Sequence, residues 1–126
     1  MKGHSDQRRR LPDVRPSITG KSAGCGHEYY VTVSFYPDEP TVPAEVFVHV
    51  AKQGTALQGW INAWATALSI ALQYGVPWKV FHAKHLHHRF EDGGDETNPS
   101  LLHAISTTIQ GLIDENKAAH EEPSGD

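Results

Sequence analysis

Residues 53–78 read QGTALQGWINAWATALSIALQYGVPW and contain no charged residue, although 21% of the chain is charged. Apolar side chains recur at helical spacing, which predicts a helix with one face against a core: Leu57, Ile61, Trp64, Ala65, Leu68 and Leu72. A second, uncharged hydrogen-bonding stripe follows the same helix: Gln58, Asn62, Thr66, Ser69 and Gln73. Because solvated helix faces usually carry Lys and Glu, we expect burial nearly all round, by the chain's own sheet and by a partner. The alternative is the central helix of an ordinary small core.

Length and charge bound the rest of the interpretation. A chain of 126 residues indicates one domain. Residues 1–21 carry six Lys or Arg, whereas residues 91–126 carry nine Asp or Glu, and the net charge is −4. This polarity suits docking on a partner, another copy included, better than binding DNA, so no DNA partner is predicted.

The single cysteine, Cys25, excludes an intrachain disulfide, a CxxC redox pair and a cysteine zinc site.

The uncharged stretch is long enough to cross a bilayer, but Gln, Asn and hydroxyl side chains occur along its length. No apolar signal segment stands at the N-terminus. We therefore predict no membrane association and a cytoplasmic protein.

Alternating side chains predict strands over 29–36 and 44–50, paired as an antiparallel hairpin. Gly75 and Pro77 are expected to end the neutral helix, and residues 78–82 to form a third strand. A last helix is expected from Asn98-Pro99, with an apolar stripe from Leu101 to Ile113. The predicted fold class is α+β, an antiparallel hairpin-based sheet with two helices packed on one face. The predicted divisions are an extended basic arm (1–16), a single domain (17–116) and a disordered acidic tail (117–126).

Four histidines cluster at His82, His85, His87 and His88. Whether they lie on a helix or on a strand, two imidazoles would share a face, but no third ligand is placed beside them. We therefore predict no metal site, and instead a solvent-facing, pH-sensitive segment.

The glycine pairs lack phosphate-loop spacing, and Gly24-Cys25-Gly26 is interpreted as a turn. No catalytic residue and no cofactor are predicted.

Several motifs together resemble the TSCPD domain family, in the branch found as the C-terminal domain of adenosylcobalamin-dependent ribonucleotide reductases. The similarity rests on RRLP with Arg15 and Lys21, EVF at 45–47, Lys52 with Gly54, SIALQYGVP at 69–77, and RFE at 89–91 with Gly94 and Asn98-Pro99. The naming Thr-Ser-Cys-Pro-Asp run is absent, and Thr55 and Asp92 replace the serine and proline usual in that branch. The reductases need several cysteines, so the resemblance implies an accessory module and not a reductase on its own.

Two functions follow as hypotheses. The first is a non-catalytic accessory module that docks on a ribonucleotide reductase large chain through the neutral stripe or the basic arm. The alternative is a free-standing nucleotide-like binder, with arginines and Lys21 on phosphate and Tyr74, Trp78 or Phe90 on a base. Both predict a homo-oligomer, with Asn62 and Gln73 at its interface. The candidate ligand- or partner-binding residues are Arg9, Arg10, Arg15, Lys21, Asn62, Thr66, Ser69, Gln73, Tyr74, Arg89 and Phe90.

Overall fold

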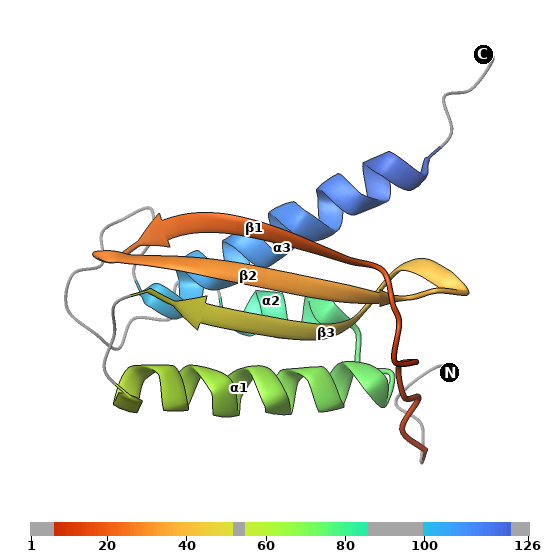
Figure 1. Cartoon of the computed structure of the whole chain (residues 1–126), viewed down its shortest axis with the longest axis horizontal. Helices are drawn as coiled ribbons and strands as arrows, with labels where there is room; N and C mark the ends of the chain where they lie inside the picture. The colour runs from red at the N-terminus through yellow and green to blue at the C-terminus, as the bar shows by residue number, and fades with distance from the viewer. Residues whose placement is uncertain (1–6, 52–54, 86–99, 122–126) are drawn as a thin grey trace.

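A computed structural model describes residues 7–51, 55–85 and 100–121 of the chain. Three antiparallel strands in the order β1-β2-β3 form one sheet, with α1 along the β3 side and α3 crossing behind the strands (Figure 1). The predicted α+β class is confirmed. The elements are β1 (Ser17–Gly24), β2 (His27–Tyr36), β3 (Glu39–Val50), α1 (Thr55–Gln73), α2 (Trp78–His85) and α3 (Leu101–His120).

The predicted antiparallel hairpin is confirmed, since β2 pairs with β3. Val31 pairs with Val48 and Val33 with Val46 in the β2–β3 register. All four valines are buried. Phe47, which lies between Val46 and Val48 in β3, points outward and is exposed. Alternation therefore places one face of this antiparallel pair in the core and Phe47 on the other face in water, although Ser34 and Tyr36 of β2 depart from it and are also buried.

Strand β1 was not predicted, because its sequence lacks large apolar residues at alternate positions. Its glycines face α3 instead: a Cβ at Gly20 would lie 2.9 Å from a Leu112 methyl, and one at Gly24 would lie 2.6 Å from the Ala104 Cβ. Cys25 and Gly26, with φ of 52° and 81°, then form the predicted turn into β2. Small residues thus let α3 pack directly on the strand.

The predicted third strand is wrong, since residues 78–85 form the helix α2. Trp78, Phe81, His82 and His85 follow one another at helical spacing and share one face. Trp78 Nε1 donates a hydrogen bond of 2.7 Å to Gln110 Oε1 on α3. A stretch of five residues is too short for periodicity to distinguish a strand from this helix.

Helix α3 differs from its prediction at both ends. Ser100 is its N-cap, and its hydroxyl accepts from the His103 amide at 3.1 Å, whereas Asn98 and Pro99 lie outside the described residues. The helix continues through His120, so residues 117–120 are helical rather than part of the expected disordered tail. The predicted apolar stripe is confirmed, with Leu101, Ile105, Ile109 and Leu112 buried.

In the described sheet β3 is an outer strand, so one of its edges has no neighbouring strand. The neutral stripe of α1 lies along this edge (Figure 1). Ser69 Oγ accepts from the Val46 amide at 2.9 Å and lies 3.2 Å from the Val46 carbonyl oxygen. Gln73 Nε2 donates to the Ala44 carbonyl at 3.0 Å. Gln58 accepts from the Val50 amide at 2.8 Å and donates to the Val48 carbonyl at 2.9 Å.

This contact gives the stripe a role within the chain. Edge amides and carbonyls need both acceptors and donors, which amide and hydroxyl side chains provide and charged ones do not. The expected burial nearly all round is wrong for the isolated chain, since Trp60 is 77% exposed and Asn62 and Thr66 are also exposed. Burial of these three residues by a partner stays a prediction.

Ser69→Ala should destabilise the fold by about 1–3 kcal/mol, because the change leaves the Val46 amide and carbonyl without their partner. Thr66→Ala is the matched control on the exposed face of the same helix, and it should change stability by less than about 0.5 kcal/mol. Urea denaturation followed by circular dichroism measures both. Equal effects of the two substitutions would contradict the role of Ser69 at the strand edge.

Substitutions of two glycines, one at the β1–α3 contact and one outside it, should have effects of opposite sign on stability. Gly24→Ala should destabilise by about 1–3 kcal/mol, because the new methyl overlaps the Ala104 side chain. Gly111→Ala, whose Cβ would meet nothing within 4 Å, should stabilise α3 by about 0.5–1 kcal/mol. Thermal unfolding compares both variants with the parent chain, and a tolerated Gly24→Ala would refute the close packing.

Candidate functional site

The basic arm folds back onto the domain at the C-terminal end of α1. The Arg9 amide donates to the Gln73 carbonyl at 2.8 Å, and the Tyr36 hydroxyl donates to the Arg9 carbonyl at 2.8 Å. The Arg9 side chain pairs with Asp38 and Glu39 and lies 3.7 Å from the centre of the Tyr36 ring. The hydrogen bond to Glu39 is the main cause that raises the pKa of Arg9, and burial raises the pKa of Tyr36.

Two more of the predicted phosphate-binding cations are also paired within the chain. Arg15 donates to both carboxylate oxygens of Glu45, at 2.9 to 3.0 Å. Lys21 lies 3.5 Å from Glu28. Arg10 is exposed. The predicted phosphate-binding residues therefore mostly neutralise the chain's own carboxylates, and they do not converge on one site.

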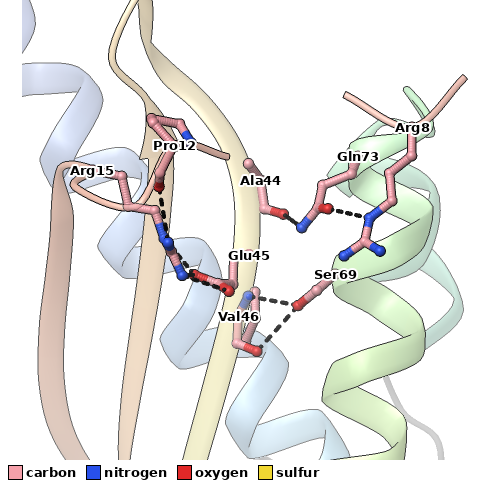
Figure 2. A network of polar contacts seen from close by, with 8 residues as sticks. All are labelled: Arg8, Pro12, Arg15, Ala44, Glu45, Val46, Ser69 and Gln73. Atoms are coloured by element: carbon pink, nitrogen blue, oxygen red, sulfur yellow. Dashed lines mark hydrogen bonds and ion pairs between the residues drawn. The ribbon is translucent and has the colours of Figure 1, made fainter. Parts of the chain in front are cut away.

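Arg8 is held differently from the other arginines of the arm. Its Nε donates to Gln73 Oε1 at 2.6 Å, and Gln73, which is 5% exposed, is itself bound to the Ala44 carbonyl (Figure 2). Within the described part of the chain, Arg8 forms no ion pair with a carboxylate. A buried amide thus orients this half-buried guanidinium without neutralising it.

Arg8 lines a groove of about 620 Å³ between β3 and α1, which we call the α1–β3 groove. Buried Val46, Val48 and Ala65 contribute apolar surface to it. Four of the predicted site residues meet in its lining: Asn62, Thr66, Ser69 and Gln73. The structure therefore brings the stripe together with one arginine, but not with the set of cations predicted for phosphate.

The groove residues absent from the predicted site include one aromatic residue and two charged ones, Phe47, Arg8 and Glu45. Phe47 is 56% exposed at an outward position of β3, between two buried valines. The alternation of β3 already places this large aromatic residue on the outward side of the strand, so the sequence could have marked it as a candidate binding residue. Glu45 had no comparable signal, because its partner Arg15 is thirty residues away.

The aromatic residues proposed to stack a base do not gather here. Trp78 is buried against α3, and Tyr74 is half-buried just beyond the C-terminal end of α1, outside the groove lining. Arg89 and Phe90 lie outside the described residues. The nucleotide hypothesis in its original form therefore has no assembled site in the described structure.

The described histidines of the 82–88 cluster differ from the solvent-facing segment predicted for them. His85 is buried and its Nε2 accepts from Trp64 Nε1 at 3.3 Å, so it is not solvent-facing. His82 stacks on Trp78, with ring centres 5.6 Å apart, and its Nδ1 lies 3.0 Å from Ser106 Oγ. His87 and His88 fall outside the described residues. Across residues 7–51, 55–85 and 100–121, no group of three possible metal ligands occurs.

A second surface lies where the first half of α1 meets the start of α3. An apolar cavity of about 280 Å³ opens there, and Trp60 projects beside it. We call it the Trp60 surface, and its lining consists of Leu57, Trp60, Ile61, Trp64, Leu101, Leu102 and Ile105. Among the described lining residues of this surface and of the α1–β3 groove there is no Cys or His.

None of the helices in the described part of the chain has both the length and the apolar character needed to cross a bilayer. No solved structure matches the chain significantly.

Known relatives are far longer than this chain. A vitamin B12-dependent ribonucleotide reductase of Rhodopirellula baltica is 44% identical over 103 residues, which cover 82% of this chain and 10% of the reductase. Reductases of the same name from Streptomyces clavuligerus and Streptantibioticus cattleyicolor are 40% identical over 99 residues, or 79% of this chain. This chain spans 10–16% of the length of these three relatives.

The model of the TSCPD domain matches residues 5–112. That range includes most of the basic arm, the whole sheet, α1, α2 and the larger part of α3. The resemblance inferred from the sequence motifs is thereby confirmed, and this chain belongs to the TSCPD domain family.

Proposed function

We propose that this chain is a non-catalytic accessory module of deoxyribonucleotide synthesis that docks on a B12-dependent ribonucleotide reductase. The named relatives are such reductases, and this chain corresponds to a minor share of their length. A domain with its own core can fold alone and still dock on a larger chain through an interface of the kind that joins domains.

The composition of the chain supports a non-catalytic role. Reduction by protein thiols delivers two electrons as two cysteines close a disulfide, so it needs a pair of thiols. This chain has one cysteine, Cys25, in the turn between β1 and β2. The chain by itself therefore cannot supply a dithiol for a reductase reaction.

The observation that carries the docking proposal is the Trp60 surface. Trp60 is 77% exposed beside an apolar cavity of about 280 Å³. Exposed tryptophans beside apolar pockets are common anchors of protein interfaces, where they contribute much of the binding energy. The neutral stripe and the basic arm, the two docking surfaces inferred from sequence, largely bind the chain's own backbone and carboxylates. The Trp60 surface takes their place in the proposal.

Trp60→Ser should weaken binding to a B12-dependent reductase by about tenfold or more, because it removes the exposed anchor. The partner for the test is the Rhodopirellula baltica reductase from which the region similar to this chain has been deleted. Val80→Ser, which removes another exposed apolar side chain from α2, is the matched control and should change the affinity by less than about twofold. Isothermal titration calorimetry measures all three affinities.

Three results would contradict the docking proposal. The parent chain would fail to bind the truncated reductase, or both variants would bind as well as the parent. Alternatively, Trp60→Ser would lower the free energy of unfolding by more than about 2 kcal/mol, showing that the ring packs within its own chain.

Light scattering on the same samples tests the predicted homo-oligomer. Trp60→Ser should dissociate the oligomer if the Trp60 surface forms its interface as well as the interface with the reductase.

A further inference from the structure

We propose that the α1–β3 groove binds a nucleotide, with its phosphate on Arg8 and its base against Phe47. This site lies outside the Trp60 surface and does not depend on docking to a reductase. It also uses different residues from those that the sequence suggested for phosphate and base.

The anion site follows from the environment of Arg8. Arg9, Arg15 and Lys21 each have a carboxylate partner, whereas half-buried Arg8 has none within the described part of the chain. The Gln73 side chain accepts only from Nε of Arg8, and the two terminal nitrogens of the Arg8 guanidinium point away from Gln73 (Figure 2). A guanidinium that is partly removed from water without a counterion is stabilised by an anion, and phosphate matches its paired donors.

The base site follows from Phe47. Its ring is 56% exposed on the outward face of β3, opposite Thr32 of β2, and it lines the same groove as Arg8. Exposed aromatic rings on an open sheet face are suitable platforms for stacking bases. A ligand that combines a planar ring with an anionic group would contact both residues.

The remaining polar groups of the groove favour an acceptor-rich ligand. Asn62 Oδ1 already accepts from Gln58 Nε2 at 2.6 Å, so its amide hydrogens are left for a ligand. The exposed Thr66 hydroxyl lines the same groove. Glu45, the carboxylate in the lining, is neutralised by Arg15. Phosphates, ribose and base edges supply the matching acceptors.

Size and edge geometry favour a small molecule over a peptide. The groove volume of about 620 Å³ falls within the usual range for small-molecule sites, about 300–1,000 Å³. An extended peptide would bind by adding a strand to β3. Ser69, Gln58 and Gln73 already bond to outward backbone groups of that strand, which blocks such an addition.

Calorimetric titration of the whole chain with ATP and dATP tests the proposal, with inorganic phosphate and adenosine as part-ligands. We expect saturable binding of a nucleotide below about 1 mM and much weaker binding of either part alone. Arg8→Gln should weaken nucleotide binding by about tenfold or more. Arg10→Gln removes the same charge from an exposed position of the same arm, and should weaken it by less than about twofold.

A second pair of variants keeps the test decisive if loss of the Arg8–Gln73 contact lowers stability. Phe47→Ser should weaken binding by about fivefold or more. Tyr30→Ser, which removes another exposed aromatic ring from the same sheet face outside the groove lining, should have little effect. Urea denaturation of all four variants checks that each one is folded at the temperature of the titration.

The proposal is overturned if neither nucleotide binds at about 1 mM. Equal losses from Arg8→Gln and Arg10→Gln would also overturn it, because they would indicate diffuse attraction. Inorganic phosphate that binds as tightly as ATP would exclude the base contact. Trp60→Ser should leave nucleotide affinity unchanged and Phe47→Ser should leave reductase docking unchanged, so failure of one proposal is distinguishable from failure of the other.

Discussion

The open edge of β3 is the constraint on which the rest of the structure depends. Its outward amides and carbonyls must find partners, and α1 supplies them from Gln58, Ser69 and Gln73. Each of these side chains can donate and accept, so one helix face serves both kinds of backbone group without a charge. This requirement explains why the helix is neutral on the face toward the strand, and it fixes α1 beside the sheet edge.

Gln73 connects this edge to the basic arm. Its side chain binds the Ala44 carbonyl and the Arg8 Nε, while its backbone carbonyl accepts from the Arg9 amide. Its backbone therefore helps to set the path of the arm, and its buried side-chain amide joins α1 to β3 and orients Arg8 (Figure 2). Arg9 and Arg15, which both follow Arg8 in the chain, are anchored to Asp38 and Glu45, so the arm is held beside the groove that Arg8 lines.

Patterns within one element predicted its faces, but not what those faces contact. The periods of β2, β3 and α1 placed the apolar core residues on the correct faces, because alternation and helical spacing are local properties, but they did not predict the burial of Ser34 and Tyr36 in β2. They assigned the neutral stripe to a partner, since spacing alone cannot distinguish a sheet edge from another protein. Strand β1 was missed because Gly20 and Gly24 occupy positions where α3 approaches closely. The pairing of Arg15 with Glu45 spans thirty residues, and no local pattern contains it.

The two candidate surfaces use different sides of α1, and this follows from helix geometry. Each residue advances the helix by about 100°, so Asn62 lies roughly 200° around from Trp60, and Thr66 about 240°. Trp60 adjoins the α3 side of the helix, whereas Asn62 and Thr66 adjoin the β3 side. A partner seated on Trp60 would therefore leave the α1–β3 groove open. Helix α1 is the element that contributes residues to both surfaces, and the strand edge holds it in place.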